Sequence, residues 1–184
     1  MAILPINLYG DDVLNKKSVK ITKVDAKLLA FISDMFDTMN NADGIGLAAN
    51  QVGSSASVFV IDLTDVEEFS YLGKMIFINP RIEFPESESI AMEEGCLSIP
   101  DVRAEVVRPK SLIIHYQDLE LKEHVMNADK WLARVIQHEY DHLQGIYFTD
   151  KVSEESKKEL KKVLQQIKDR KIDCDYPVTS KKKK

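Results

Sequence analysis

The segment 137–142, with the sequence QHEYDH, constrains the fold and chemistry of this 184-residue chain more than any other. It lies in a stretch from about 129 to 144 whose apolar residues recur at helical spacing, which predicts an amphipathic helix. His138 and His142 are four residues apart, so both project from one face of that helix, about a turn from each other. Two imidazoles in this arrangement can bind one metal ion, with Glu139 beside it as a general base.

The predicted helix places both histidines and Glu139 on its apolar side. That side consists of two adjacent stripes: Trp131, Val135, His138 and His142, and then Leu132, Ile136, Glu139 and Leu143. The polar side is expected to consist of Arg134, Gln137, Asp141 and Gln144. Burying an unpaired carboxylate costs several kcal/mol, so Glu139 on the apolar side indicates a partner for it. The alternative is that Glu139 lies at the rim of this face and reaches solvent.

The identity of a third metal ligand stays open at the level of residue patterns. A catalytic site normally has three protein ligands and an open position for water. Cys96 lies in the segment 94–98 (EGCLS), which we expect to be a tight connection between strands. A single cysteine is more often a small buried apolar residue than a ligand. Alternatively Glu154, Glu155 or Glu159 would complete the two-His, one-Glu site of an ordinary metalloprotease.

A glycine-containing segment, residues 44–53 (GIGLAANQVG), is a third candidate element of a site. Its small residues let a backbone approach a ligand closely, and the amide of Gln51 can donate hydrogen bonds to an oxyanion. A plain loop leading into a strand at Val58 would explain the same composition. The segment is not a phosphate-binding loop, because no Gly-Lys-Ser/Thr follows it.

The order of the predicted elements favours an α+β fold. An amphipathic helix is expected over 25–40, and a further helix is expected after Ser153, a good N-cap. The expected strands, which lie between the first two helices, are 58–61, 75–78, 102–107 and 111–116. Strands that cluster in this way, without alternating with helices, predict mixed or antiparallel sheets packed around a central metal-binding helix.

Charge divides the chain into an acidic body and a basic C-terminal segment. Residues 1–150 contain 13 Lys and Arg against 24 Asp and Glu, a net charge of −11, whereas residues 151–184 contain 12 against 6, a net of +6. We expect residues 1–150 to be the catalytic part and 151–184 to be an amphipathic helix and basic tail of the same domain. The helix either docks on the body with solvated lysines or belongs to a non-enzymatic interaction module. The acidic body argues against general or sequence-specific nucleic-acid binding.

Composition excludes several further classes of protein. The chain has only two cysteines, Cys96 and Cys174, so no disulfide framework organises it, and Cys174 is expected to be a non-functional thiol. No apolar run approaches the roughly 20 residues that span a bilayer. The start of the sequence lacks the features of a secretory signal or transit segment, so a cytoplasmic location of bacterial type is expected.

Three segments in the order 44–51, 94–98 and 137–142 closely resemble the motifs of the peptide deformylase family. That family is characterised by a Gly-rich segment ending in Gln, an EGCLS segment, and a QHExDH helix. The resemblance extends from about residue 10 to 146. It implies an enzyme that removes the formyl group from the N-terminal methionine of nascent polypeptides.

The resemblance also implies roles for individual residues at the reaction centre. The implied metal ligands are Cys96, His138 and His142. The ion is expected to be Fe(2+), with Zn(2+), Ni(2+) or Co(2+) as substitutes, and a water or hydroxide takes the fourth position. That water attacks the formyl carbonyl while Glu139 takes its proton and later passes it to the departing amine. The side chain of Gln51 and the backbone N–H of Leu97 would stabilise the oxyanion.

Substrate and partner contacts follow from the same resemblance. The implied substrate-binding residues are Ile45, Gly46, Glu94, Gly95, Arg103 and Val135. The peptide would add as a strand, with Ile45 and Gly46 on one side and Glu94 and Gly95 on the other. Its methionine side chain would enter an apolar pocket that includes Ile45 and Val135. The basic C-terminal segment would make a transient contact with the ribosome, where the substrate emerges.

Two residues depart from the family pattern near these motifs. Asn50 stands where Pro or Thr is more frequent, and Arg134 stands beside the pocket wall where many relatives have an apolar residue. Neither departure removes an implied metal ligand, the base or an oxyanion donor. The sequence therefore predicts an active enzyme and leaves the effect of these two residues to the structure.

Overall fold

The computed structural model describes residues 2–181. Within them the α-helices are α1 (Ala26–Asn41), α2 (Lys130–Leu143) and α3 (Glu154–Lys168). The strands are β1 (Gly46–Ala48), β2 (Val58–Asp62), β3 (Lys74–Glu83), β4 (Ser89–Cys96), β5 (Ile99–Pro109), β6 (Ser111–Gln117) and β7 (Glu123–Asp129). Short 3-10 helices are η1 (Asp12–Asn15), η2 (Ala49–Val52), η3 (Glu67–Leu72) and η4 (Phe148–Asp150).

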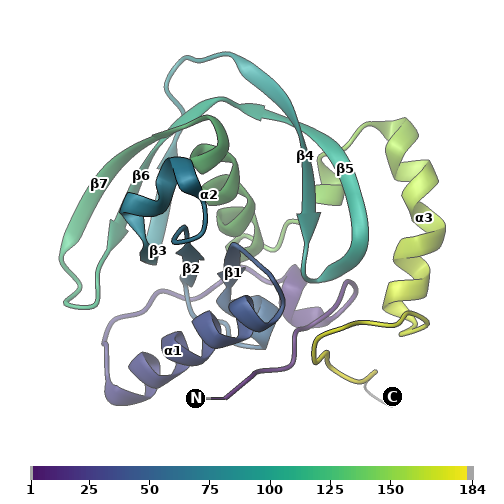
Figure 1. The fold of residues 1–184 in the computed structure, drawn as a ribbon, viewed down its shortest axis with the longest axis horizontal. Coiled ribbons are helices and arrows are strands. Elements are labelled where there is room, and N and C mark those ends of the chain that lie inside the picture. Colours follow the sequence, from purple (N-terminus) through teal and green to yellow (C-terminus); the bar gives the residue numbers. More distant parts are fainter. Residues whose placement is uncertain (1, 182–184) are drawn as a thin grey trace.

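The strands form two antiparallel sheets, as Figure 1 shows. Five strands make a sheet in the order β1-β2-β3-β6-β7, and β4 and β5 make a separate hairpin. Every pair of neighbouring strands is antiparallel, so the predicted α+β class with antiparallel sheets is confirmed. A bulge between Ile78 and Arg81 shifts the register of β3 against β6.

The four predicted strands lie within β2, β3, β5 and β6, but β1, β4 and β7 were not predicted. The segment 94–98 is therefore mostly strand: β4 continues to Cys96, and only Leu97 and Ser98 form the turn to β5. The glycine at position 95 and the polar residues before it hid this strand, because they break the apolar alternation that marks a half-buried strand.

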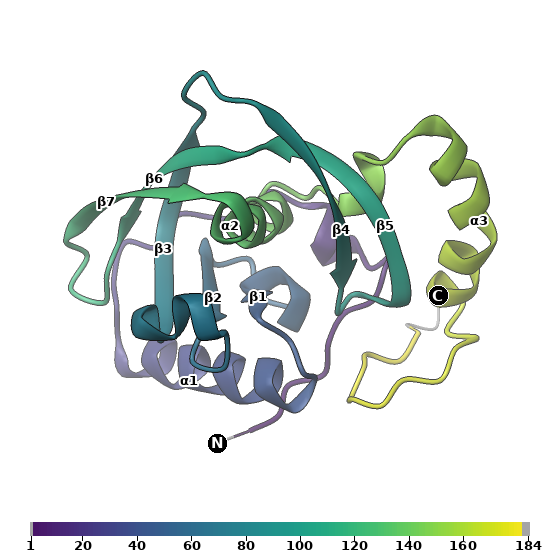
Figure 2. The same cartoon turned by 45° about the horizontal axis from the view of Figure 1, so that its top comes forward.

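The five-stranded sheet is packed between two helices (Figure 2). In β2, Val58 and Val60 belong to the cluster of apolar residues that contains α1, whereas Phe59 and Ile61 belong to the cluster that contains α2. This alternation is the two-residue period of a strand, and both of its faces are apolar because a helix covers each face of the sheet. The sheet thus holds α2 in the centre of the molecule.

The hairpin β4–β5 covers the predicted polar side of α2, so most of this side is buried. Arg134, Gln137 and Asp141 are buried, and Gln144 is half-buried. Each of the three buried side chains is hydrogen-bonded to the hairpin. Their partners there are Glu94, the carbonyl of Pro109 and Arg108, respectively. Polar residues on this helix face therefore mark a buried polar contact with a second sheet.

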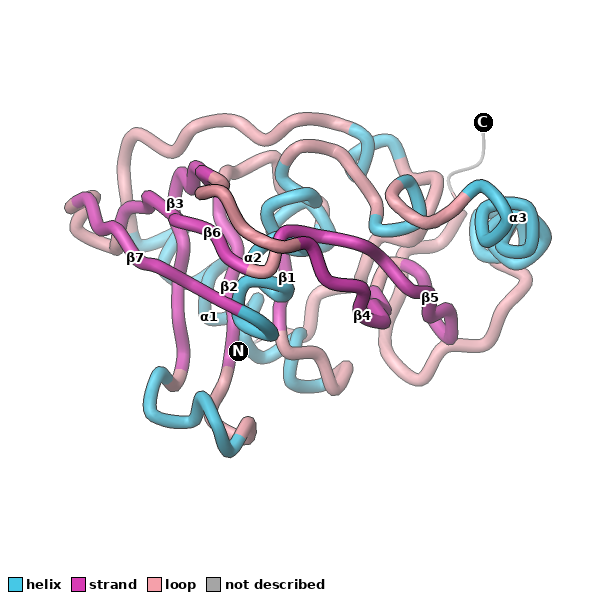
Figure 3. The backbone as a smooth tube through the Cα atoms, turned by 90° about the horizontal axis from the view of Figure 1, so that it is seen from above, coloured by secondary structure: helices cyan, strands magenta, loops and turns pink. Residues whose placement is uncertain are grey.

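The C-terminal helix α3 packs on the far side of β5, at the edge of the molecule opposite β7 (Figure 3). Ser153 caps it, accepting a hydrogen bond from the N–H of Ser156 at 3.1 Å. Its apolar stripe belongs to a core cluster shared with β5, and Ile167 is fully buried there. No helix among residues 2–181 is long and apolar enough to cross a membrane.

Candidate metal centre and active site

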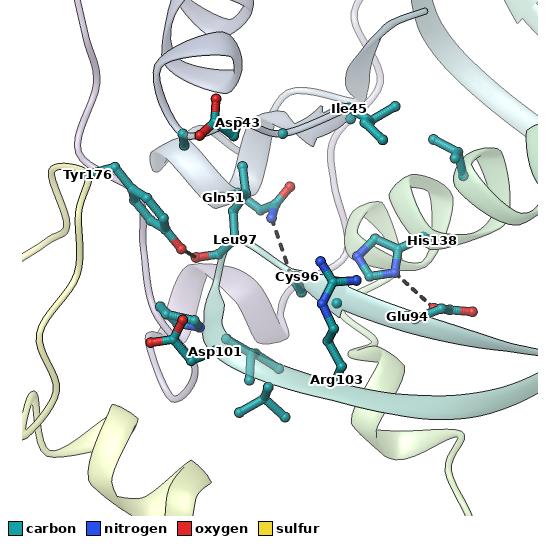
Figure 4. A pocket seen from close by; sticks show the side chains of 18 of the residues that line it. Asp43, Ile45, Gln51, Glu94, Cys96, Leu97, Asp101, Arg103, His138 and Tyr176 are labelled. Atoms are coloured by element: carbon teal, nitrogen blue, oxygen red, sulfur yellow. Dashed lines mark hydrogen bonds and ion pairs between the residues drawn. The ribbon is translucent and has the colours of Figure 1, made fainter. Parts of the chain in front are cut away.

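Three side chains with metal-binding atoms converge where the end of β4 meets α2. One ligand atom each from Cys96, His138 and His142 lies within 4.8 Å of the other two. The Sγ of Cys96 is 3.1 Å from Nε2 of His142, and Figure 4 shows His138 beside Cys96 at the floor of a cleft. Nδ1 of His142 is buried without a hydrogen-bond partner among the described residues. One thiol and two imidazoles are a donor set suited to Zn(2+) or Fe(2+), so these residues fit a metal ion.

Glu94 fixes the orientation of His138 from behind. Its Oε2 is 2.9 Å from Nδ1 of His138, so the other ring nitrogen is left for a ligand. Glu94 is itself held by Arg108, whose Nε donates to it at 2.6 Å, and by Arg134, whose Nη1 donates at 2.7 Å. Burial alone would raise the pKa of Glu94, but hydrogen bonds from His138 and Arg108 hold this pKa well below the usual range of a carboxyl group. The side chain of Glu94 thus belongs to the support of the histidine.

The two histidines differ in their electrostatic surroundings. Burial, together with the charges of His138 and Arg108, lowers the pKa of His142 well below its ordinary value. Burial also opposes protonation of His138, but hydrogen bonds to Cys96 and Glu94 outweigh it and raise the pKa of His138 to about 10. The asymmetry arises because the carboxylate of Glu94 is hydrogen-bonded to Nδ1 of His138, whereas Nδ1 of His142 has no hydrogen-bond partner among the described residues.

Glu139 is buried beside the ligand cluster, with 4% of its surface exposed, so the alternative in which it reaches solvent is wrong. Its Oε2 has no hydrogen-bond partner among the described residues. Burial raises the pKa of Glu139 to about 7, and Glu94 adds to the shift while the charge of His138 opposes it. A Cβ at Gly46 would stand 2.5 Å from Oε1 of Glu139, so the glycine makes room for this carboxylate. A buried acceptor without a partner is suited to a proton of a reacting molecule.

The 3-10 helix η2 directs Gln51 toward the same centre. Oε1 of Gln51 accepts the N–H of Ala48 at 2.8 Å, which fixes the orientation of the amide. Its Nε2 therefore faces the centre, 3.6 Å from Sγ of Cys96 and 3.3 Å from Oγ of Ser98. The neighbouring Asn50 is buried and donates to the carbonyl of His142, so this departure from the family pattern ties the Gly-rich segment to the end of α2.

A cleft of about 550 Å³ opens above these residues. All six substrate positions implied by the sequence line it: Ile45, Gly46, Glu94, Gly95, Arg103 and Val135. Gln51, Cys96, Leu97, His138 and Glu139 line it as well, and His142 lies behind them. Arg103 is largely exposed and reaches Glu93 at 3.8 Å. The cleft therefore brings the three sequence motifs together at one place.

The pattern of the polypeptide deformylase family matches residues 3–158.

This chain belongs to the peptide deformylase family.

Its relatives and structural neighbours extend this assignment over nearly the whole chain. The peptide deformylase of Cytophaga hutchinsonii is 48% identical over 175 residues, covering 94% of each chain. That of Chlorobaculum parvum is 43% identical over 176 residues, covering 96% of this chain and 94% of the relative. The crystal structure of a plant peptide deformylase superposes with a TM-score of 0.85 at 32% identity, covering 93% and 92% of the two chains. The Thermotoga maritima enzyme superposes with a TM-score of 0.77 at 37% identity, covering 83% and 99%.

The chain is accordingly a metal-dependent hydrolase that removes the N-formyl group from formyl-methionyl peptides. The alternative reading, a general metalloprotease with a downstream glutamate ligand, has no support in the deformylase fold. Glu154, Glu155 and Glu159 are exposed on α3. Among residues 2–181, the group of side chains placed to hold a metal is the one formed by Cys96 and the two histidines.

Sequence reasoning missed one part of the deformylase cleft. Residues 173–176, which follow α3, line it as well. The hydroxyl of Tyr176 donates to the carbonyl of Leu97 at 2.7 Å, as Figure 4 shows. These two residues are 79 positions apart. No local pattern could have indicated a contact between them, because it depends on the path of the chain after α3.

Arg134, the second departure from the family pattern, has a structural role beneath the same cleft. Besides Glu94, it donates to the carbonyl of Val106 at 2.8 Å and to that of Ile90 at 2.7 Å. These acceptors lie on both strands of the hairpin, so Arg134 joins β4 and β5 to α2. A buried guanidinium is stable here because the carboxylate of Glu94 and two backbone carbonyls accept its hydrogen bonds.

Proposed function

We propose that Cys96, His138 and His142 hold the catalytic metal ion of this deformylase. The convergence of their ligand atoms within 4.8 Å supports this assignment. We propose Fe(2+) as the resident ion, with Zn(2+), Ni(2+) or Co(2+) as substitutes, since the thiol and imidazole donors suit these ions. When bound, such an ion lowers the pKa of water and polarises the carbonyl of the formyl group.

Glu139 acts as general base and then as general acid. Its Oε2, which has no hydrogen-bond partner within residues 2–181, is buried next to the ligand cluster, where it can accept a proton from the attacking water. The same carboxyl then gives that proton to the departing amine of methionine. Nε2 of Gln51 and the N–H of Leu97 stabilise the negative charge that develops on the formyl oxygen. The hydrogen bond from the N–H of Ala48 to Oε1 of Gln51 keeps the side-chain amide in this orientation, so the amide need not reorient during the reaction.

The substrate lies in the cleft as an extended peptide. Gly46 at the start of β1 and Gly95 near the end of β4 offer backbone groups on its two sides. The methionine side chain contacts Ile45 and Val135, which line the cleft from two different elements. Arg103, exposed at the rim, contacts the peptide beyond methionine.

The basic C-terminal segment makes a transient contact with the ribosome in the cytoplasm. Residues 1–150 form the catalytic part, and 151–184 belong to the same domain. Lys158, Lys161 and Lys162 are exposed on α3, where they can meet phosphate groups. Replacing all three by Gln should weaken ribosome binding and flatten its dependence on salt. Unchanged affinity and an unchanged salt slope would exclude this contact.

Replacing the cysteine ligand tests the metal assignment directly. Anaerobically purified Cys96→Ala should retain little metal and lose deformylation of a formyl-methionyl peptide. Cys174→Ala provides the matched control, because its thiol lies outside the ligand cluster and the variant should keep its metal. Stoichiometric metal and full activity in Cys96→Ala would contradict the assignment.

A further inference from the structure

One peptide group, between Leu97 and Ser98, connects the C-terminal segment to the proposed metal site. Its carbonyl accepts the hydroxyl of Tyr176 at 2.7 Å, and its N–H donates to Sγ of Cys96 at 3.4 Å. A peptide group is a rigid plane, so the direction of its carbonyl sets the direction of its N–H. A group that holds the carbonyl therefore also aims the N–H at the sulfur of Cys96.

The segment that carries the tyrosine is tied down on both sides. After it, the N–H of Ile6 donates to the carbonyl of Pro177 at 2.9 Å, and the N–H of Thr179 donates to the carbonyl of Ile6 at 2.9 Å. Before it, Arg170 forms an ion pair with Asp11 at 2.7 Å. Residues near the start of the chain thus hold the segment that follows α3 in place. This support gives the tyrosine hydroxyl a defined position above the turn.

The turn itself is held from two further directions. The N–H of Tyr9 donates to the carbonyl of Ser98 at 2.8 Å. The side chain of Leu97 packs so closely on Gly44 that a Cβ there would stand 2.7 Å from Cδ1. Burial, reinforced by Cys174, raises the pKa of Tyr176, so its hydroxyl stays protonated and remains a donor. The turn is therefore restrained at its side chain and at both of its carbonyls.

We propose that Tyr176 is a positioning residue for the metal-binding thiolate. Its hydroxyl fixes and polarises the Leu97–Ser98 peptide, and that peptide donates its N–H to Cys96. Hydrogen bonds to a ligand atom adjust the donor strength of the ligand and hence the metal. The inference rests on the proposed function, in which Cys96 is a metal ligand. It gives the C-terminal segment a part in the reaction, 80 residues beyond the cysteine.

The test compares Tyr176→Phe with wild type and with Tyr71→Phe, a matched control at a position that is 79% exposed. Each protein is loaded with Co(2+), and the sulfur-to-cobalt charge-transfer band is recorded. Tyr176→Phe loses the hydrogen bond to the carbonyl of Leu97, which should weaken the hydrogen bond from the N–H of Ser98 to Sγ of Cys96. A sulfur with a weaker hydrogen bond is a stronger electron donor, so the band should move to lower energy. The amide of Ser98 should also exchange its hydrogen faster. With full metal content, kcat should fall about tenfold while KM stays nearly constant.

The outcomes separate this inference from the assignment on which it depends. A band and a Ser98 exchange rate that are unchanged in Tyr176→Phe, or equally changed in Tyr71→Phe, would overturn the role of Tyr176 alone. If wild-type protein loaded with Co(2+) shows no sulfur-to-cobalt band, Cys96 is not a ligand and the proposed function fails with it. A shifted band with faster exchange and lower kcat, in Tyr176→Phe only, supports the proposal.

Discussion

The two walls of the cleft are built in different ways. The wall formed by the end of β4 and by α2 is buried: Glu94, Glu139 and His142 are each at most 5% exposed. Glu94 on this wall is paired with both Arg108 and Arg134. The opposite wall, residues 173–176, follows the last helix and alternates exposed with half-buried residues. It depends on single hydrogen bonds such as that from Tyr176 to Leu97.

This contrast shows where rigidity is needed in this enzyme. Proton transfer and metal binding tolerate little displacement, so the first wall uses side chains that packing and ion pairs hold in place. The second wall needs only to keep one turn in position and to border the substrate. Changes to the two walls should therefore differ in size and in kind.

Breaking the ion pairs of the buried wall should have a large effect on stability. Arg108→Met removes one of the cationic partners of Glu94 and of Asp141, leaving two buried carboxylates with less counter-charge. The free energy of unfolding, measured with denaturant, should fall by about 3 kcal/mol or more. Lys110→Met is the control, because its pair with Glu88 is exposed and is worth at most about 1 kcal/mol. Equal stability losses in the two variants would show that the buried wall is no more tightly held than the surface.

A small change beside the general base should have a specific effect on turnover. Gly46→Ala places a methyl group where the carboxylate of Glu139 lies, 2.5 Å from Oε1. The carboxylate must move, and kcat should fall by about 10- to 100-fold, since displacements near 1 Å cost that much. Steady-state kinetics with metal analysis checks this, and the metal content should stay at the wild-type level. An unchanged kcat would mean that Glu139 is not held where this cleft places it.

Charge on the second wall, residues 173–176, should have a small effect on which peptides the enzyme prefers. Asp173 and Asp175 are exposed and line the cleft, so they attract a basic peptide. Changing both to Asn should raise KM about two- to threefold for formyl-Met-Lys peptides at low salt, and less at high salt. The control is Glu155→Gln with Glu159→Gln, because these exposed acids lie on α3 outside the cleft. The same change in KM for formyl-Met-Glu peptides would contradict a charge effect.

The sequence predicted the first wall well because its parts are local patterns. Two histidines on one helix face, a Gly-rich segment and the EGCLS motif each lie within a few consecutive residues. The structure brings the predicted ligand atoms and Glu139 together at the floor of one cleft. The helices and four of the strands followed from apolar periodicity, which reports directly on burial.

Two features could not be predicted because they depend on contacts between distant parts of the chain. Arg134 and Asp141 were expected on the polar side of α2, and the β4–β5 hairpin buries them. The approach of Tyr176 to Leu97 depends on how the chain turns after α3 and pairs with its own beginning. A polar residue on a helix gives no indication of whether water or a buried partner satisfies it.

In the proposed reaction centre, a metal ion held by Cys96, His138 and His142 works with Glu139 as the base. Wild type and Glu139→Ala, both prepared anaerobically, are assayed on a formyl-methionyl peptide, and the metal content of each is measured. We predict about one divalent metal ion per chain in both proteins. The kcat of Glu139→Ala should be lower than that of wild type by about 100-fold or more. Full activity in Glu139→Ala at equal metal content would contradict the mechanism.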